Sequence, residues 1–417
     1  MARPKRITTT LLSLARRTQS KISSILFPSP LPAEGSSGAV VQYAPEKKPG
    51  AQQGLCGEAL VLASQLDGQT FRLPDLWKVL ADWPLAANPH AERLEGLVNS
   101  ILERHITSEK KLRALKQANF ARLISLWYPD AEWPELEAAT AYSVWIFVWD
   151  DEVDAGDTDV SLDEELSRAY YKKSLSTIHR LLGLDDAGGD DQGGSEEEET
   201  LHPNMVLFGD AARSLRSSTD KIQRERFYRE MENFMIQVGV EHSHRMRGSI
   251  PTVDKYMEIR SGSVGCAPQI AITDFMLKIR LPESIMESAA MKALWRETVV
   301  ICLILNDVYS VQKEIAQGSL LNLVPVIFKN CIPEKQNLDT VTADVEVALQ
   351  GSIRGFEDAA ASLGQMVADD AQLDKDVQSF IRWCRYFITG VQQWSIESAR
   401  YGMAECLQED GSLSIVL

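Results

Sequence analysis

The sequence predicts an all-α protein, and two observations carry this prediction. From Phe71 onwards, apolar residues recur at three- and four-residue spacing with charged residues between them, as in amphipathic helices. No segment shows the sustained apolar/polar alternation with hairpin turns that predicts strands. Hydrophobic residues make up 44% of the chain, and no apolar run reaches the ~18 residues of a membrane span. We therefore expect a soluble protein with no membrane span.

Residues 1–68 are expected to form an arm outside the helical domain. Residues 1–33 are rich in Ser, Thr and basic residues, and a Pro-, Gly- and Ser-rich stretch follows as far as Gly54. This composition predicts a disordered tail, followed by a short helix at residues 55–66. An organelle-targeting peptide is the alternative that a basic N-terminus also fits.

The helical domain is expected to span residues 69–405, with a C-terminal tail at residues 406–417. The acidic, Gly-rich segment 185–200 has nothing to bury, so it predicts a disordered loop between helices. Prolines and interruptions of the apolar periodicity divide the rest into predicted helices at residues 91–127, 136–149, 162–184, 204–240, 252–259, 267–277, 291–305, 341–366 and 374–400.

Charge and cysteine content exclude some classes of function. The formal net charge of −16 argues against nucleic-acid binding, which needs a basic surface. The six cysteines are scattered without a CxxC pair or a metal-ligand spacing with histidine, so we expect reduced thiols and a cytoplasmic protein. His242 and His244 have no third ligand residue nearby and are interpreted as surface residues.

Three aspartates, Asp150, Asp151 and Asp154, follow the apolar, aromatic-rich run 144–149. In a helix, Asp150 and Asp154 lie one turn apart with Asp151 beside them, so their carboxylates converge. A buried cluster of this kind is costly without a counter-charge, and a hard divalent cation removes that cost. Carboxylate ligands that leave positions for water and phosphate favour Mg²⁺. Alone, such a cluster is more often a solvated helix end.

A second polar stripe supports the metal interpretation. Asn306, Ser310 and Glu314 follow the apolar run 299–305 at positions i, i+4 and i+8, on one face of a helix. Their amide, hydroxyl and carboxylate oxygens can chelate another magnesium ion. Lys313 lies beside them as a phosphate donor.

Together the motifs D-D-x-x-D and N-D-x-x-S-x-x-x-E resemble those of the class I terpene synthases (terpene cyclases), specifically the fungal sesquiterpene type. Two further features match the family. Arg260 lies 46 residues before Asn306, where the family has an arginine that senses diphosphate. Arg400 and Tyr401 match its C-terminal Arg-Tyr pair. The likeness covers about residues 71–401 and implies a single class I terpenoid synthase α-helical bundle around a central active-site cavity.

The resemblance also implies a reaction and its residues. An allylic prenyl diphosphate, preferably farnesyl diphosphate, would be ionised with three magnesium ions, and the cation would cyclise to a sesquiterpene hydrocarbon or alcohol. The implied metal ligands are Asp150, Asp151, Asp154, Asn306, Ser310 and Glu314. The implied diphosphate donors are Arg260, Lys313, Arg400 and Tyr401. Aromatic rings can stabilise a cation in the pocket, and the candidates are Trp127, Phe147 and Trp394. Trp145 and Trp149 are interpreted as packing residues.

Two other functions stay open at this point. A chain-elongating prenyl transferase shares the fold and the first acidic motif, although here Asn306 to Glu314 replaces the second aspartate-rich motif of that family. A helical scaffold that has lost catalysis is the other alternative. The segment Ser261 to Gly265 interrupts the apolar pattern with two glycines, which predicts a break in the helix beside Arg260. The resemblance implies that this break offers a main-chain carbonyl to the allyl cation of the substrate, and a simple kink is the alternative. The product skeleton is not predictable, and we expect a monomer or a homodimer.

Overall fold

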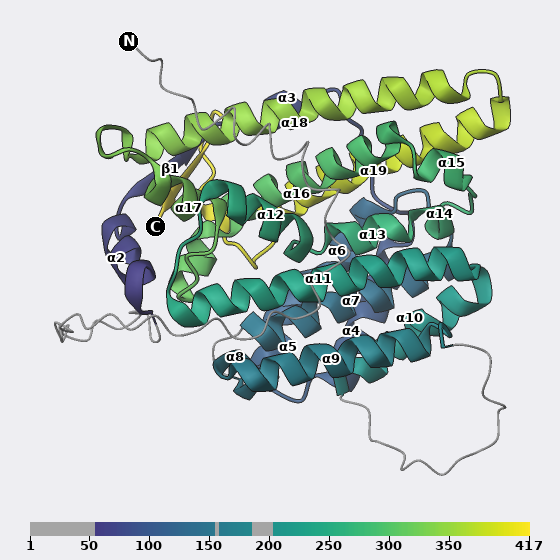
Figure 1. The fold of residues 1–417 in the computed structure, drawn as a ribbon, viewed down its shortest axis with the longest axis horizontal. Coiled ribbons are helices and arrows are strands. Elements are labelled where there is room, and N and C mark those ends of the chain that lie inside the picture. The colour runs from purple at the N-terminus through teal and green to yellow at the C-terminus, as the bar shows by residue number, and fades with distance from the viewer. Residues whose placement is uncertain (1–54, 155–157, 186–202) are drawn as a thin grey trace.

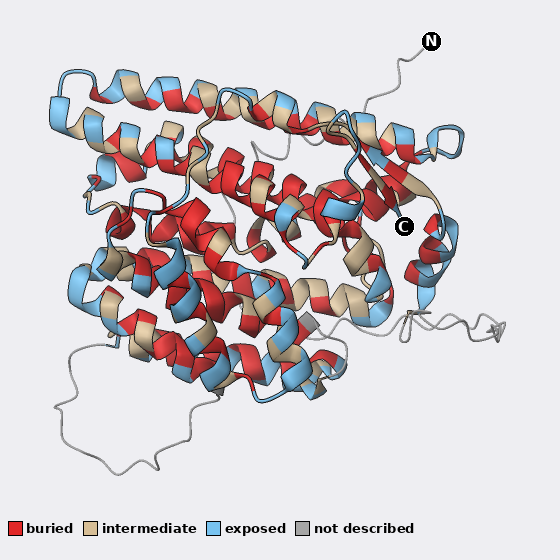
Figure 2. Ribbon diagram, turned by 180° about the vertical axis from the view of Figure 1, so that it is seen from behind, coloured by how far each residue is buried: buried red, intermediate tan, exposed pale blue. Residues whose placement is uncertain are grey.

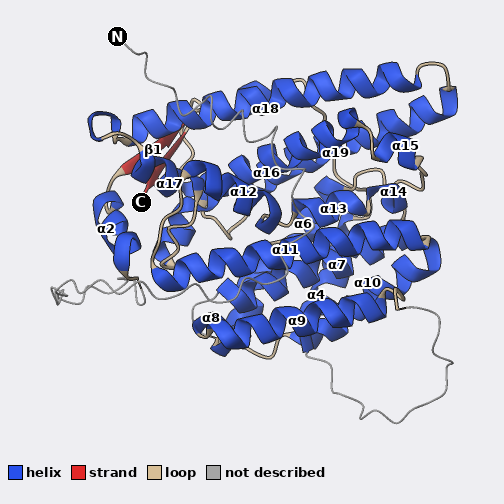
Figure 3. Cartoon of the chain, in the orientation of Figure 1, coloured by secondary structure: helices blue, strands red, loops and turns tan. Residues whose placement is uncertain are grey.

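The computed structural model describes residues 55–154, 158–185 and 203–417, and most of these residues are helical (Figure 3). The all-α prediction is confirmed. In chain order the α-helices are α2 (Gly57–Leu66), α3 (Trp77–Leu80), α4 (Ala91–His105), α5 (Glu109–Gln117), α6 (Phe120–Trp127), α7 (Trp133–Asp154), α8 (Asp159–Leu162), α9 (Glu164–Leu181), α10 (Pro203–Ser218), α11 (Lys221–Arg247), α12 (Val253–Ser263), α13 (Cys266–Ala271), α14 (Thr273–Met276), α15 (Glu283–Met286), α16 (Ala289–Ala316), α17 (Leu323–Asn330), α18 (Leu338–Val367) and α19 (Ala371–Glu397). There are also two 3₁₀ turns: η2 (Pro333–Lys335) lies between α17 and α18, and η3 (Met403–Glu405) follows α19.

The core lies between two groups of long helices (Figure 1). In one group, α16 packs against α18 and α19. In the other, α7 packs against α10 and α4, and α9 packs against both α10 and α11. Helices α6 and α13 connect the groups, because α6 contacts both α7 and α19, and α13 contacts both α11 and α16. Buried residues concentrate on the central helices, while the outer helices expose one face to solvent (Figure 2).

Local signals explain where the helices that carry the motifs begin and break. The Ser288 hydroxyl accepts a hydrogen bond from the Met291 amide and starts α16, as an N-cap residue does. The predicted break at residues 261–265 is present, because α12 ends at Ser263 and α13 starts at Cys266. Between them Gly265 has a φ of +74°, a left-handed conformation that favours glycine.

A small sheet corrects the prediction for the C-terminus, which is more than a tail. Strand β1 (Thr70–Leu73) pairs antiparallel with β2 (Leu413–Val416), with Phe71 opposite Ile415. Each strand has four residues, too few for the alternation to stand out, and the partners are far apart in the sequence. The sheet ties the C-terminal strand to the start of the domain.

Part of the segment predicted as an arm, residues 1–68, belongs to the folded domain. Helix α2 confirms the short helix predicted at residues 55–66, and it belongs to the fold, since Leu62 and Leu66 are fully buried. Residues 1–54 lie outside the described residues, as does the predicted acidic loop from residue 186 onwards.

All six cysteines are free thiols, as predicted. Within the described ranges, no helix combines the length and apolarity needed to cross a membrane.

Candidate active site

The first acidic motif lies at the C-terminal end of α7. Trp145 and Trp149 of this helix are fully buried and Trp149 Nε1 donates to Ser174 Oγ at 3.0 Å, which confirms their packing role. Directly after Trp149, the helix reaches the partly buried Asp150 and Asp151. The side chain of Asp154 lies outside the described residues. The described side chains include no cluster of three acidic, histidine or cysteine groups that could hold a metal, so the three-aspartate prediction stays a prediction.

Basic side chains surround Asp151. Arg400 Nη2 donates to its Oδ1 at 2.9 Å, although Arg400 lies far away in the sequence. Burial acts to raise the pKa of Asp151, but the charges of Arg400, Lys313 and Lys111 outweigh burial and hold that pKa below its usual value. The structure therefore brings the predicted donors Arg400 and Lys313 within electrostatic range of the first motif.

The second motif forms one stripe on α16, as predicted. Asn306 Oδ1 accepts from Arg260 Nη2 at 2.7 Å, and its Nδ2 donates to the Tyr401 hydroxyl at 3.1 Å. Glu314 Oε2 accepts from Asn322 Nδ2 at 3.0 Å. Ser310 Oγ is buried and, among the described residues, has no hydrogen-bond partner. A buried hydroxyl without a partner is costly, so an oxygen-seeking ligand at this position would satisfy it.

The buried Asp307, which the sequence analysis did not single out, holds Arg260 in place. Its Oδ1 accepts from Arg260 Nε at 3.0 Å, and its Oδ2 accepts from the Tyr256 hydroxyl and from the Leu323 amide. Burial acts to lower the pKa of Arg260, but Asp307 and Glu241 outweigh burial and raise that pKa well above its usual value. Arg260 is therefore a fixed cation beside Asn306. A charged residue one position beyond Asn306, between the apolar run 299–305 and Val308, was the signal that could have identified Asp307.

The C-terminal pair Arg400 and Tyr401 contacts both motifs. Arg400 binds Asp151 of the first motif, while Tyr401 binds Asn306 of the second. Burial raises the pKa of Tyr401, so its hydroxyl stays protonated and can donate a hydrogen bond. The Arg400 guanidinium also lies 5.6 Å from the centre of the Phe147 ring. Four segments, from α7, α12, α16 and the residues after α19, thus meet at one place.

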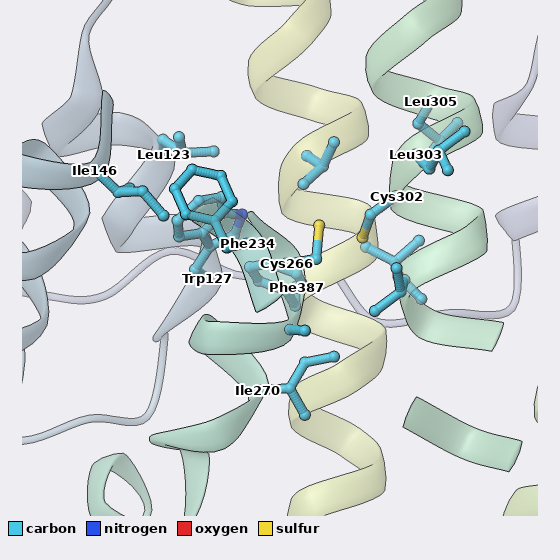
Figure 4. Packing of buried hydrophobic residues seen from close by; sticks show 14 of the residues in the cluster. Leu123, Trp127, Ile146, Phe234, Cys266, Ile270, Cys302, Leu303, Leu305 and Phe387 are labelled. Carbon is cyan, nitrogen blue, oxygen red and sulfur yellow. The ribbon is translucent and has the colours of Figure 1, made fainter. Parts of the chain in front are cut away.

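Two of the three candidate aromatic residues lie at this junction. Phe147 stacks on Phe120 with ring centres 4.6 Å apart, and Trp394 lies 6.1 Å from Phe147. Trp394 also contacts Tyr401 edge-on at 5.4 Å. The third candidate, Trp127, packs against Phe387 at 4.7 Å and is not among these ring contacts. It lies with the apolar side chains that α6, α7, α11, α13, α16 and α19 contribute to the interior (Figure 4).

The interpretation of His242 as a surface residue is wrong. His242 is only 1% exposed, and its Nε2 lies 3.0 Å from the carbonyl oxygen of Ser161 on α8. Ser161 is 81 residues away from His242 in the sequence, so the local sequence pattern could not indicate this partner. His244 is half-buried, with its Nδ1 2.8 Å from Ser249 Oγ.

The fold and the two facing polar motifs define a helical-bundle enzyme of the class I terpene synthase type. The model of terpene synthase family 2, C-terminal metal binding, matches residues 141–350. This chain belongs to that family, and the family prediction is confirmed.

Curated relatives are terpene cyclases. Sesquiterpene cyclase hepA of Aspergillus oryzae is 26% identical over 361 residues, which cover 85% of this chain and 96% of the relative. Terpene cyclase braA of Annulohypoxylon truncatum is 25% identical over 348 residues, covering 82% of this chain and 89% of the relative. These names support an enzyme of the terpene cyclase type.

Solved structures support the fold. α-Eudesmol synthase superposes with a TM-score of 0.64 at 16% identity, covering 76% of this chain and 98% of that chain. Hedycaryol synthase in complex with nerolidol superposes with a TM-score of 0.59 at 17% identity, covering 75% of this chain and 96% of that chain. At these identities the likeness concerns the fold, the class I α-helical bundle that the sequence predicts.

Proposed function

We propose that this protein is a magnesium-dependent sesquiterpene synthase, a carbon–oxygen lyase that ionises farnesyl diphosphate and cyclises the farnesyl cation to a cyclic hydrocarbon or alcohol. The supporting observation is the position of Arg400 and Tyr401, which contact Asp151 and Asn306 at the same time. A diphosphate at this junction would be within reach of oxygen ligands on α7 and α16 and of cationic donors on α12 and after α19. The relatives' names as sesquiterpene cyclases point to the same substrate class.

The residues at the junction fit magnesium. Asp150, Asp151 and Asp154 would hold the ions on the α7 side, and the Asn306, Ser310 and Glu314 oxygens would hold one on the α16 side; we expect three ions in all. Ser310 Oγ supports this assignment, because it is a buried oxygen without a protein partner among the described residues. When bound, magnesium neutralises charge on the leaving diphosphate and favours cleavage of the carbon–oxygen bond.

Side chains of the protein then bind the diphosphate. Arg260, Lys313, Arg400 and Tyr401 supply the donors, and guanidinium groups match phosphate oxygens at two points. Arg400 Nε is buried and lacks a partner among the described residues, so a donor remains for an oxygen of the substrate. Because negative charge develops on the diphosphate only as the bond breaks, these donors favour the transition state over the bound substrate.

The carbocation needs an apolar surrounding that does not react with it. Phe147 and Trp394 lie next to the Arg-Tyr pair, where their faces could each stabilise a cation by about 0.5 to 2 kcal/mol. Trp127 packs against Phe387 in the interior cluster and would line the hydrocarbon end of the pocket. An apolar lining of this kind would keep water away until the cyclisation ends.

Product analysis tests the proposed function. Purified protein is incubated with magnesium and, separately, with geranyl, farnesyl and geranylgeranyl diphosphate, and volatile products are identified by gas chromatography and mass spectrometry. We expect a cyclic C15 product from farnesyl diphosphate that disappears when a chelator is added. Longer prenyl diphosphates formed only with added isopentenyl diphosphate would mean a prenyl transferase, and no product from any substrate would mean a non-catalytic protein.

A further inference from the structure

The segment Glu241 to Arg245 lies near the C-terminal end of α11. It contacts α12, which carries Arg260, and α7, which carries the first acidic motif. Successive side chains of this segment contact different elements. Glu241 faces Arg260 of α12 at 3.8 Å, His242 meets α8, and Ser243 Oγ donates to Glu164 of α9 at 3.0 Å. Arg245 Nη2 donates to the carbonyl oxygen of Val153 in α7 at 2.9 Å.

The contact of Arg245 falls inside the first acidic motif. The last four carbonyls of a helix have no partner within that helix. In α7, Thr158 Oγ1 donates to the Glu152 carbonyl at 2.6 Å, and Arg245 donates to the Val153 carbonyl. These two carbonyls belong to the residues between Asp151 and Asp154. Side chains from elsewhere in the fold therefore hold the backbone that carries the aspartates.

Charge favours this contact as well. A cation at the C-terminal end of a helix interacts favourably with the partial negative charge of the terminal carbonyls. Here the same cation also lies next to a turn that carries several carboxylates, whose mutual repulsion it reduces. Glu241 and Arg245 are four residues apart, so they lie on one face of α11 and direct opposite charges toward Arg260 and α7 respectively.

We propose that Arg245 is a positioning residue for the first metal site: it fixes the last turn of α7 in the geometry in which the aspartates bind magnesium. It acts through the Val153 backbone rather than by touching substrate. This inference rests on the proposed function, because it gives that site a further residue outside both motifs. Carboxylate ligands need such outer support, and losing it typically costs about 10- to 100-fold in metal affinity.

Three variants test the inference. Arg245→Met removes the charge and the donor, while Arg245→Lys keeps a charge and a donor of similar reach. The matched control is Arg247→Met, two residues further along α11, whose side chain is 65% exposed and whose Nη2 lies 4.0 Å from Glu164 Oε1. Circular dichroism establishes that each variant is folded. Binding of inorganic pyrophosphate is then measured by calorimetry over a series of magnesium concentrations.

We expect Arg245→Met to raise the magnesium concentration needed for half-maximal pyrophosphate binding about tenfold, with part of the loss recovered in Arg245→Lys and none seen in Arg247→Met. Hydrogen exchange without ligand gives a second measurement that does not depend on catalysis. Amides of residues 150–154 should exchange faster in Arg245→Met than in the wild type, because the last turn of α7 loses a restraint.

The outcomes separate this inference from the proposed function. A wild-type protein that binds no pyrophosphate at any magnesium concentration would refute the proposed function and the role of Arg245 with it. Wild-type binding that is unchanged in folded Arg245→Met would refute the role of Arg245 alone. Equal losses in Arg245→Met and Arg247→Met would also overturn it, since the effect would then be one of general surface charge.

Discussion

At the residue scale, the buried Asp307 is the group on which the position of Arg260 depends. It is fully buried and hydrogen-bonded to Arg260, Tyr256 and the Leu323 amide. Asp307→Ala leaves the Arg260 charge without its main carboxylate, which we expect to lower the free energy of unfolding by about 3 kcal/mol. Urea unfolding measures this change. Asp358→Ala, an exposed aspartate of α18, is the control that should stay close to wild type.

Asp151 gives a prediction about pH. Its pKa is lowered in the folded protein, despite burial, by Arg400 and by two lysines. A lowered folded-state pKa means that the charged form contributes stability above the unfolded pKa, and that this contribution is lost as pH falls through the folded pKa. Asp151→Asn should therefore be less stable than wild type at pH 7, with the difference shrinking below about pH 4. A difference that grows toward low pH in thermal unfolding would contradict this.

The sequence could predict some residues of the site and not others, for a physical reason. Asn306, Ser310 and Glu314 share a helical stripe, so local spacing is enough to group them. Asp307 follows Asn306 directly on the same helix, and its partners come from α12 and from the start of α17. Its role depends on contacts between distant segments, which spacing along one helix does not encode.

At the element scale, the β1–β2 pair anchors the segment that follows Arg400 and Tyr401. Ile415 is fully buried beneath the sheet, while its neighbour Val416 is 53% exposed. Ile415→Ala should lower the free energy of unfolding by about 2 kcal/mol and weaken substrate binding, because the Arg-Tyr segment loses its anchor. Val416→Ala, on the opposite face, is expected to change stability by less than about 0.5 kcal/mol. Equal effects in chemical denaturation would show that the sheet does not hold this segment.

Helices were more predictable than strands in this chain. The long helices repeat their apolar spacing over several turns, and the glycine-rich break before α13 is visible as an interruption of that pattern. The strands β1 and β2 have four residues each and are stabilised by one another, so neither is recognisable alone.

At the scale of the whole molecule, α2 is the first helix among the described residues and packs into the fold. Leu62 and Leu66 of α2 are fully buried, and Lys329 of α17 lies 3.3 Å from Glu58. Deleting residues 2–54 keeps every described contact, so we expect an unchanged melting temperature and unchanged turnover. Deleting residues 2–66 removes buried leucines worth about 1.5 to 3 kcal/mol each and should lower the melting temperature clearly. Differential scanning calorimetry compares the two truncations, and equal melting temperatures would mean that α2 does not stabilise the fold.

The proposed mechanism requires both polar motifs to act on one diphosphate. The most direct measurement is pyrophosphate release from farnesyl diphosphate by Asp150→Ala and Asn306→Ala, with Asp159→Ala as an exposed acidic control and circular dichroism to verify helicity. We predict that each of the first two variants loses at least about a hundredfold in rate while its helical content stays intact, and that the control keeps the wild-type rate. Wild-type turnover in either Asp150→Ala or Asn306→Ala would contradict a site built from both motifs.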